Sequence, residues 1–323
     1  MKVTVVIPNY NGISFLKDCM DSLEKQTYKD FSVLVVDNAS KDTSAQFLQE
    51  NYPWVEVLEL DKNYGFSGAV NKGIAHAKSE YVILLNNDTA SDENYVAELV
   101  KCMDKDEKIF SANPKMIQMY NKELLDDAGD MYSVIGWGFQ RGVGQKSSGY
   151  NRECRIFSSC AGAAIYRRSV FDEIGMFDEM HFAYLEDIDV GYRARIAGYK
   201  NVYCPASIVY HVGSGTSGSK YNDFKVKLAA RNGIYLNYKN MPLLMLVINF
   251  IPIAFGMLVK YLFFLKKGFG KAYTGGVKEG IKTCRSCKKV RFKLKNLWSY
   301  IRIEFELIVN LFIYIFEFIK RKL

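Results

Sequence analysis

The chain has 323 residues, of which 49% are hydrophobic and 14% aromatic, so it can bury a substantial core and is not an intrinsically disordered protein. Its formal net charge of +8 is unevenly distributed, because residues 1–240 hold 27 Lys and Arg against 31 Asp and Glu, whereas residues 241–323 hold 16 against 4. A basic tail can bind nucleic acid or an anionic membrane surface, and the apolar stretches beside these charges favour the membrane. We therefore expect a globular domain over residues 1–240 and a basic, apolar helical region over residues 241–323.

The first sixty residues predict a parallel βαβ unit. Residues 3–7 form a β-branched strand that ends in turn-forming residues, and apolar residues at helical spacing follow Ser14, a suitable helix cap. Residues 31–36 form a second strand, and residues 55–60 a third. Strands connected in this way are parallel and joined by right-handed crossovers, so we expect an α/β fold.

A fourth predicted strand, residues 81–85, carries the clearest sign of a binding site. Its five apolar residues indicate a buried strand, and Asn86, Asn87 and Asp88 follow it directly. Open α/β sheets bind ligands at the carboxyl ends of their strands, so we expect these polar groups at a ligand. A carboxylate after a strand is also common in ordinary turns, so this feature alone identifies no enzyme.

The next seventy residues are less regular. Ser91 predicts the start of a helix with Asp92 and Glu93 in its first turn. Between residues 113 and 160, six glycines separated by polar residues indicate hairpins and a mobile loop. Such a loop can cover a site or contact an acceptor, and it can equally be ordinary surface.

A second group of ordered residues begins at Gly175 and ends at His211. It includes Phe177-Asp178-Glu179 and Glu186-Asp187-x-Asp189-x-x-x-Arg193. With the strands before it, this pattern resembles the family 2 glycosyltransferases of GT-A fold, and the matching segments cover roughly two thirds of the chain, from residue 3 to residue 211. The resemblance implies a Rossmann-like nucleotide-diphospho-sugar transferase domain, and the overall pattern looks most like rhamnosyltransferases.

The resemblance implies a donor-binding set at the strand ends. Asp37 resembles the acid that accepts the imide N–H of a pyrimidine base, a suitable role because a carboxylate only accepts hydrogen bonds. The other residues of this set contact the nucleotide or pack the site: Pro8, Asn9, Tyr10, Asn11, Asn63, Gly65, Asn71, Asn86 and Asn87. Asn86 replaces the usual first acid of an Asp-x-Asp motif, which leaves one charge fewer for a metal.

The resemblance also implies a divalent cation. Asp88 resembles the metal-binding acid of the family, and His211 matches a position that adds an imidazole ligand in some members. Mixed oxygen and imidazole ligands suit Mn²⁺ or Mg²⁺, which would neutralise charge on the departing diphosphate. The alternative for His211 is an ordinary histidine at the end of a strand.

The acid Asp187 is the candidate catalytic base. In the family this residue removes the proton of the acceptor hydroxyl while the anomeric carbon is attacked from behind, which implies inversion. Glu186 is the competing assignment, because adjacent side chains point in different directions. Arg193 either contacts the diphosphate or forms a structural ion pair with Asp189, four residues away on a predicted helix.

The C-terminal region has two apolar stretches separated by a basic one. Residues 242–259 are apolar except for Asn249, and Pro252 should kink a helix there. Residues 266–295 carry eleven Lys and Arg against one acid. If residues 242–259 and a second apolar stretch near residues 303–319 both spanned a bilayer, the basic segment between them would lie outside, against the positive-inside rule. We therefore expect helices that dip into the cytosolic leaflet, with the basic segment on anionic lipid.

The last predicted helix is amphipathic, with Arg302, Glu306, Asn310 and Glu317 on its polar side. Its apolar side consists of Ile301, Phe305, Ile308, Phe312, Ile315, Phe316 and Ile319. We expect the apolar side to contact lipid. The alternative is that these helices pack on the catalytic domain or in a homodimer.

These observations predict an inverting, metal-dependent glycosyltransferase on the cytosolic face of a membrane. The best donor is dTDP-L-rhamnose and the acceptor a lipid-linked glycan of a bacterial surface polysaccharide, with no nucleic acid involved. UDP-linked glucose, galactose, galactofuranose or N-acetylhexosamine would use the same residues. A catalytically silent membrane scaffold of the same fold is the alternative from another class of protein.

Overall fold

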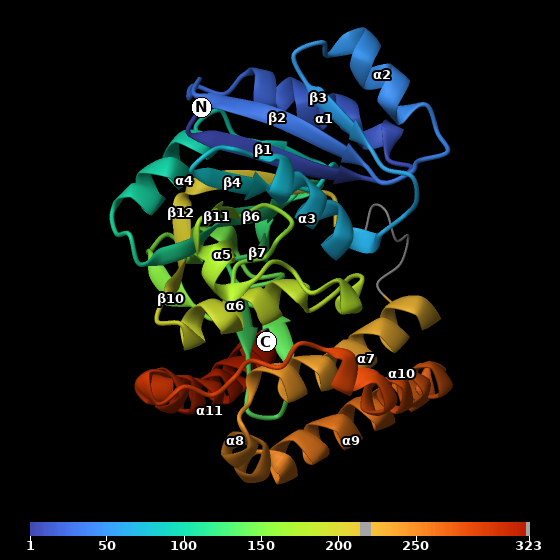
Figure 1. The fold of residues 1–323 in the computed structure, drawn as a ribbon, viewed down its shortest axis with the longest axis vertical. Coiled ribbons are helices and arrows are strands. Elements are labelled where there is room, and N and C mark those ends of the chain that lie inside the picture. The colour runs from blue at the N-terminus through green and yellow to red at the C-terminus, as the bar shows by residue number, and fades with distance from the viewer. Residues whose placement is uncertain (214–220, 321–323) are drawn as a thin grey trace.

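The computed structural model describes residues 1–213 and 221–320, and Figure 1 shows a domain built on a sheet next to a layer of C-terminal helices. The main sheet has the strand order β10-β12-β6-β11-β4-β1-β2-β3, with β5 paired to β12 and β7 to β6, and β8 and β9 form a separate hairpin. The strands are β1 (Val3–Asn9), β2 (Phe31–Asp37), β3 (Glu56–Glu59), β4 (Tyr81–Leu84), β5 (Thr89–Ser91), β6 (Ile109–Gln118), β7 (Asn121–Asp127), β8 (Asp130–Tyr132), β9 (Gly138–Gln140), β10 (Cys154–Ile156), β11 (Ile165–Arg167) and β12 (Lys200–His211). The α-helices are α1 (Ile13–Glu24), α2 (Ser44–Asn51), α3 (Gly65–His76), α4 (Tyr95–Asp104), α5 (Val170–Ile174), α6 (Glu186–Ile196), α7 (Asp223–Asn240), α8 (Leu243–Ile248), α9 (Phe250–Lys266), α10 (Gly270–Thr283) and α11 (Leu297–Lys320).

The predicted βαβ unit is confirmed. β1 pairs in parallel with β2 and β4, and β2 with β3. Since side chains of a strand alternate between its two faces, Val5 and Ile7 pack with α1, α2 and α4, whereas Val6 packs with α3. Both faces of the central strands are therefore covered by helices, which explains why these strands are continuously apolar. The antiparallel strand β11 then joins this parallel half to β6 and β12.

Two predicted helix starts were wrong. Ser14 lies inside α1, whose N-cap is Gly12 and has no side-chain hydrogen bond. Ser91 ends β5, and α4 begins four residues later. Ser91 is held in the sheet instead, because it pairs with Val209 of β12 and its N–H donates to the Ser22 hydroxyl at 3.0 Å.

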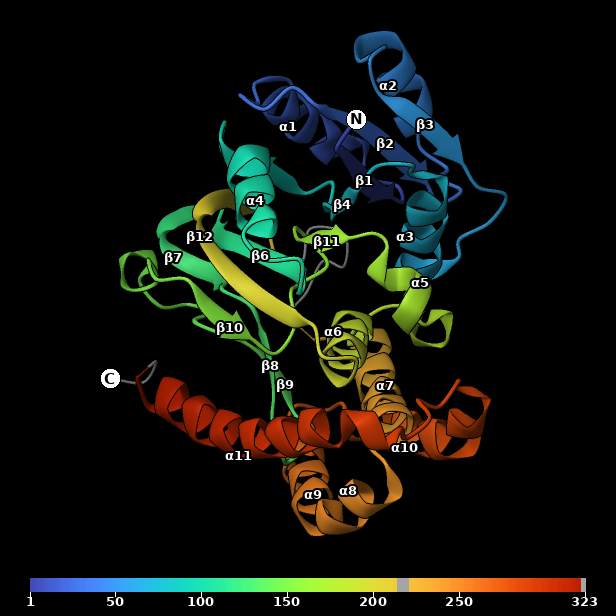
Figure 2. The ribbon, with the colours of Figure 1, turned by 60° about the vertical axis from the view of Figure 1, so that its left-hand side comes forward.

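The expected hairpins between residues 113 and 160 are present. β6 and β7 pair in antiparallel fashion, as do β8 and β9. The turn that joins β8 to β9 extends away from the main sheet toward the C-terminal helices (Figure 2). This region therefore links the sheet to the helical layer.

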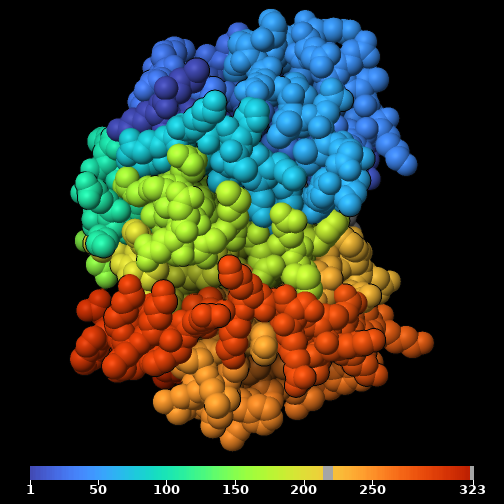
Figure 3. All heavy atoms as spheres, in the orientation of Figure 1, coloured from blue at the N-terminus to red at the C-terminus, as the bar shows by residue number. Residues whose placement is uncertain are grey.

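The C-terminal helices gather at one end of the molecule (Figure 3). α7 packs against α10 and also reaches α6, so it touches both the helical layer and the sheet domain. The kink expected at Pro252 is a complete break, because α8 ends and α9 begins around Asn249, within one turn of the residue that lacks a backbone N–H. No helix in the described part of the chain is long and apolar enough to span a membrane.

Candidate active site

The ends of β1, β2 and β4 bring three of the predicted donor-binding residues into one hydrogen-bonded row. Asn87 Nδ2 donates to Asn9 Oδ1 at 2.7 Å, and Asn9 Nδ2 donates to Asp37 Oδ1 at 2.9 Å. Ser40 adds its hydroxyl to Asp37 Oδ1 at 2.6 Å and its N–H to Asp37 Oδ2 at 3.0 Å. All three side chains of the row are buried, and parallel strands explain why they meet, since their carboxyl ends share one edge.

Gly12 packs directly against this row, and the sequence pattern did not identify it as a site residue. A Cβ at this position would lie 2.0 Å from Asn87 Nδ2 and 2.6 Å from Asn9 Oδ1. Its neighbour Asn11 has a φ of 51° and accepts a hydrogen bond from the N–H of Lys41 at 2.7 Å. The turn after β1 therefore packs tightly on the row and on the loop that follows Asp37.

Two other predicted donor-binding residues, Asn63 and Gly65, shape the entrance to α3. Asn38, which the sequence reasoning also missed, donates from Nδ2 to Asn63 Oδ1 at 3.0 Å and to the Gly65 carbonyl at 3.1 Å. Gly65 has a φ of +72°, and a Cβ there would lie 2.5 Å from the Phe182 ring. Only glycine therefore allows α3 to approach the loop before α6.

Three further members of the predicted set have separate positions. Pro8 lies within β1, and Tyr10 is exposed just after it. Asn71 lies on α3 and bonds both the N–H and the carbonyl of Phe177, at 3.0 and 2.8 Å, so it packs the site.

The candidate metal ligands Asp88 and His211 lie next to each other. Asp88 Oδ1 is 3.3 Å from His211 Nε2, and Asp126 Oδ2 is 2.7 Å from His211 Nδ1. Burial lowers the pKa of His211, but hydrogen bonds to Asp126 and Asp88 outweigh it and raise the pKa to about 10. A carboxylate and an imidazole oriented by a second carboxylate suit a divalent cation, which would displace the imidazole proton that these acids favour. Asp126 is therefore a third member of this group that the sequence reasoning missed.

Asp187 lies in the first turn of α6, where the helix dipole favours a carboxylate. Burial raises its pKa, while hydrogen bonds from the N–H groups of Ile188 and Ala161 and from Asp130 lower it. Glu186 is less accessible, at 6% exposed, and its Oε2 has no hydrogen-bond partner in residues 1–213 and 221–320. Of the two adjacent acids, Asp187 is therefore the more accessible one.

The side chain of Asp130, at the start of β8, completes this group of acids. One ligand atom each from Asp130, Cys160 and Asp187 lies within 4.8 Å of the other two. Burial and the charge of Asp187 raise the pKa of Asp130 well above its usual value, and burial does the same for the Cys160 thiol. A protonated thiol is a poor ligand for a hard cation, so we interpret the cluster as an acid pair that shares a proton.

The segment 160–162 lies between Asp187 and Asn86. The Ala161 N–H stabilises Asp187, and the Gly162 carbonyl accepts a hydrogen bond from the Asn86 N–H at 2.7 Å. A Cβ at Gly162 would lie 3.0 Å from Asn86 Nδ2. The donor-binding row and the candidate base therefore lie on either side of one short segment.

The loop before α6 is strained. Phe182, Tyr184 and Leu185 have backbone φ values of 63°, 71° and 66°, which residues other than glycine rarely adopt. Asn232 of α7 holds this loop by donating from Nδ2 to the carbonyls of His181, Ala183 and Tyr184 at 2.8 to 2.9 Å. Strained backbone clamped in this way is typical of residues positioned for chemistry.

The guanidinium group of Arg193 does not face a diphosphate. Its five N–H donors are used within the protein, on the Asp189 carboxylate and on the carbonyls of residues 174, 175 and 176. Burial opposes ionisation of Asp189, but Arg193 and Lys239 hold its pKa well below the usual range. The diphosphate role is therefore corrected in favour of the structural ion pair.

Comparisons with known proteins agree with this architecture. The family model described as glycosyl transferase family 2 matches residues 4–175. An N-acetylglucosaminyl-diphospho-decaprenol L-rhamnosyltransferase of Mycobacterium tuberculosis is 28% identical over 238 residues, which cover 66% of this chain and 77% of the relative. The O-antigen chain rhamnosyltransferase RfbN of Salmonella typhimurium is 25% identical over 218 residues, which cover 65% of this chain and 66% of the relative.

A solved structure shows the same fold over most of the chain. The mannosyltransferase PcManGT of Pyrobaculum calidifontis, in complex with GDP-Man and Mn²⁺, matches with a TM-score of 0.55 and covers 93% of this chain and 79% of its own. At 15% sequence identity this likeness shows the fold alone, which is the mixed α/β, GT-A-like fold.

Proposed function

This chain belongs to glycosyl transferase family 2 and is similar to its rhamnosyltransferases, and we propose that it transfers L-rhamnose from dTDP-rhamnose to a lipid-linked glycan. The observation that carries the proposal is that the predicted residues form three groups: Asp37 in the hydrogen-bonded row, Asp88 beside His211, and Asp187 beside the segment 160–162, whose Gly162 carbonyl accepts from the Asn86 N–H. These groups supply the three functions that transfer requires: binding the nucleotide, stabilising the departing diphosphate and accepting a proton.

In this mechanism Asp37 recognises the base of the donor. Asn9 and Ser40 fix its carboxylate by hydrogen bonds, which leaves lone pairs for the imide N–H of thymine or uracil. Asn86 is half-buried beside Gly162 and can donate to ribose hydroxyl groups. A pyrimidine donor is therefore consistent with the acceptor-only character of Asp37.

Asp88 and His211 would hold a divalent cation, with Asp126 fixing the orientation of the imidazole. When bound, Mn²⁺ or Mg²⁺ supplies positive charge that stabilises the nucleoside diphosphate as it leaves.

Asp187 accepts the proton of the acceptor hydroxyl. The acceptor oxygen attacks the anomeric carbon, the bond from that carbon to the diphosphate breaks, and the proton passes to the Asp187 carboxylate. Asp187 is suited to this role because it is partly exposed, unlike Glu186, and because desolvation raises its pKa above that of an ordinary carboxyl group. Attack from the side opposite the diphosphate inverts the anomeric carbon.

The C-terminal layer supports a peripheral position on the cytosolic face of a membrane, through residues 241–323. Large apolar side chains are exposed along α8, α9 and α11: Leu243 (74%), Leu244 (70%), Phe250 (70%), Ile251 (77%), Phe305 (70%), Phe312 (65%) and Phe316 (68%). The inner side of α11 packs on the protein through the buried Ile303 and Leu307, and Asn310 beside them donates to the Tyr132 carbonyl at 2.8 Å. An apolar face turned outward beside a segment with eleven Lys and Arg is typical of an interfacial helix on anionic lipid.

A donor panel tests the proposed transfer. Purified protein with Mn²⁺ or Mg²⁺ and a lipid extract is given dTDP-rhamnose beside the UDP-linked sugars, and release of nucleoside diphosphate is followed. We expect release from dTDP-rhamnose at least tenfold faster than from any other donor. Faster release from a UDP-sugar would replace rhamnose as the transferred sugar, and no release from any donor would contradict the transfer itself.

Flotation with liposomes tests the membrane position. We expect the protein to float with liposomes that contain anionic lipid and to remain bound less well at high salt, because salt screens the basic segment. Equal binding to neutral and anionic liposomes would contradict the role of the basic segment.

A further inference from the structure

The segment 160–162, between β10 and β11, belongs to no strand and is held by a side chain of β6. The Cys160 N–H donates to Asn113 Oδ1 at 2.7 Å. The next N–H, of Ala161, stabilises the Asp187 carboxylate. Since the two N–H groups follow each other on one short turn, the support at Cys160 decides where the Ala161 N–H points.

Asn113 is fully buried, and both ends of its amide are held. Its Nδ2 donates to Asp127 Oδ2 at 3.0 Å and to the Pro114 carbonyl at 2.8 Å. If the amide were rotated by half a turn, Nδ2 would face the Cys160 N–H, and two donors would oppose each other. Asp127 excludes this orientation, because its oxygen accepts from Nδ2 and leaves Asn113 Oδ1 for the Cys160 N–H.

Asp127 lies at the end of β7 and is itself fully buried. Its Oδ2 also accepts from the Gly129 N–H at 3.0 Å, whereas its Oδ1 has no hydrogen-bond partner among the described residues. Burial raises the pKa of Asp127 to about 7. An unpartnered buried polar atom destabilises a fold, so such atoms are typical of sites where a side chain is needed for position or chemistry.

Asp127 also lies between two acids of the candidate site. Immediately before it in the chain, Asp126 Oδ2 is 2.7 Å from His211 Nδ1. Shortly after it, Asp130 forms a hydrogen bond with Asp187. The connection from β7 to β8 therefore carries acids to the cation group and to the base, and Asp127 fixes this connection to β6.

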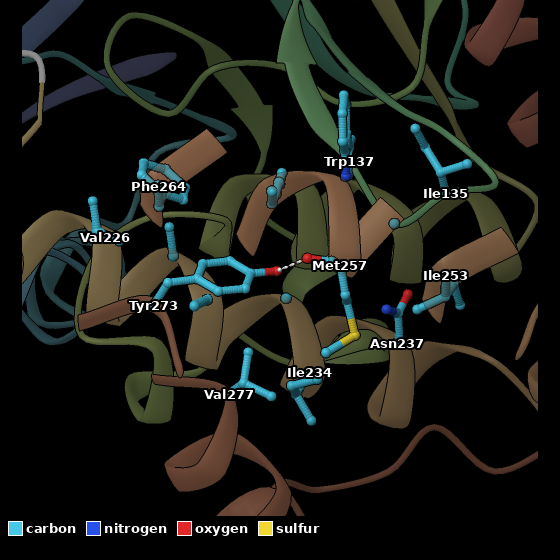
Figure 4. Close-up of a pocket in the computed structure, with 15 residues that line it drawn as sticks. Ile135, Trp137, Val226, Ile234, Asn237, Ile253, Met257, Phe264, Tyr273 and Val277 are labelled. Carbon is cyan, nitrogen blue, oxygen red and sulfur yellow. Dashed lines mark hydrogen bonds between the residues drawn. The ribbon is translucent and has the colours of Figure 1, made fainter. Parts of the chain in front are cut away.

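The hairpin that begins at Asp130 is also held at its far end. Figure 4 shows Trp137 and Ile135, from the turn between β8 and β9, at a cavity of about 100 Å³ that α7, α9 and α10 line. Trp137 Nε1 donates to the Gly256 carbonyl of α9 at 3.0 Å, and a Cβ at Gly256 would lie 2.1 Å from the Ile135 carbonyl oxygen. The helical layer therefore fixes the turn of this hairpin, whereas Asp127 fixes the chain that enters it.

From these contacts we propose that Asn113, held in one orientation by Asp127, is a positioning residue of the catalytic base. It fixes the segment 160–162 so that the Ala161 N–H points at Asp187. The proposal rests on the proposed function, because it concerns the base of that reaction. If the segment loses this support, the Asp187 anion loses a hydrogen bond, and its pKa rises because hydrogen bonds to the charged form lower a pKa.

NMR titration of Asp187 tests the proposal without any substrate. The protein is labelled with carbon-13 at the carboxyl carbon of aspartate, and the Asp187 signal is assigned by its absence from Asp187→Asn. Asn113→Leu keeps most of the side-chain volume but cannot accept a hydrogen bond, so we expect the pKa of Asp187 to rise by about half a unit or more. The acids that face Asp187, namely Glu186 and Asp130, are unchanged in this variant.

Matched variants separate position from stability. Asp127→Leu leaves the Asn113 amide free to rotate and should also raise the pKa of Asp187, whereas Asp127→Asn still offers an oxygen to Asn113 and should restore the value of the unchanged protein. Asn249→Leu removes an equally buried amide where α8 meets α9 and should not move this pKa. If Asn113→Leu does not fold, Asn113→Ser, whose hydroxyl is too short to reach the segment, takes its place with the same expected rise.

The outcomes also separate this proposal from the proposed function. An Asp187 pKa that is unchanged in both Asn113→Leu and Asp127→Leu, or that rises equally in Asn249→Leu, would overturn the proposal. A rise in Asp127→Asn as large as in Asp127→Leu would contradict the orienting role of the Asp127 oxygen. If the unchanged protein releases nothing from any donor but the Asp187 pKa responds as expected, the proposed transfer fails and the positioning stands. If it transfers sugar while this pKa does not respond, the reverse holds.

Discussion

The two groups of acids in the site differ in what surrounds their carboxylates. Asp88 lies beside His211, which Asp126 also contacts, so two carboxyl groups and one imidazole offer oxygen and nitrogen ligands there. Asp187 and Asp130 form no ion pair with Lys, Arg or His in the described ranges, and burial raises the pKa of both. The same residue type is therefore suited to hold a cation in one group and to accept a proton in the other, because the environment differs.

The largest effect is expected from removing the proton acceptor. Asp187→Asn keeps the shape and the hydrogen bond from Ile188 but cannot take up a proton, so turnover should fall by about 10²- to 10⁴-fold. Initial rates of nucleoside diphosphate release with acceptor lipid measure this. Turnover within twofold of the unchanged protein would exclude Asp187 as the base, and Glu186→Gln serves as the matched control at the competing position.

Changes to the proposed cation ligands should lower turnover less than Asp187→Asn does, and the two variants should differ in size of effect. His211→Ala removes a ligand, whereas Asp126→Asn removes only the group that orients it, which typically costs about 10- to 100-fold in metal affinity or activity. We therefore expect both variants to need more Mn²⁺ for half-maximal turnover, with the larger shift in His211→Ala. A Mn²⁺ dependence unchanged in both would contradict this assignment.

Asn232, which holds the strained loop before α6, should affect turnover by fixing the position of Asp187. Asn232→Ala removes three hydrogen bonds to the loop that leads into α6. The His181 carbonyl keeps its bond from Arg231, whereas a buried acceptor left without a partner costs about 1 to 3 kcal/mol. Turnover should fall several-fold with donor affinity unchanged. A loss of thermal stability with unchanged turnover of the folded fraction would show that the role of Asn232 is structural alone.

The smallest effect concerns pH. The base works ionised, so turnover falls as pH drops through the pKa of Asp187, which burial holds above its ordinary value. Burial raises the pKa of Asp130 well above its ordinary value, and its hydrogen bond lowers the pKa of Asp187, so Asp130→Ala should move this acidic limb to higher pH. Asp130→Asn keeps a donor and should leave the limb in place, and identical profiles for both variants would contradict the shared proton.

The residues at the ends of the parallel strands could be predicted from the sequence, because the pattern that marks them lies within a few neighbouring residues. A buried strand followed at once by polar residues places Asn9, Asp37 and Asn87 at one edge of a sheet, and the structure has them hydrogen-bonded there. The residues that were missed depend on long-range contacts. Asp126 and Asp130 lie in a stretch with weak periodicity. The close spacing of Asp126, Asp127 and Asp130 was nevertheless a usable signal of a polar site.

The helical region shows the same limit. Periodicity identified the exposed apolar side of α11, but it missed that the inner side includes the buried Ile303 and Leu307 and that Arg302 is exposed. Asn310 and Glu317 face inward because the Tyr132 carbonyl and the Gly142 N–H offer partners, and only the folded structure brings these groups together. The role of Arg193 was left open for the same reason, since three carbonyls from another segment take up its donors.

The most direct test of the division between the two groups is donor binding measured by calorimetry in the presence of Mn²⁺. Unchanged protein, Asp187→Asn and Asp88→Asn are titrated with the donor selected by the panel. We expect the same donor affinity for Asp187→Asn as for the unchanged protein, and at least tenfold weaker binding for Asp88→Asn. Full donor binding by Asp88→Asn together with lost binding by Asp187→Asn would contradict this division.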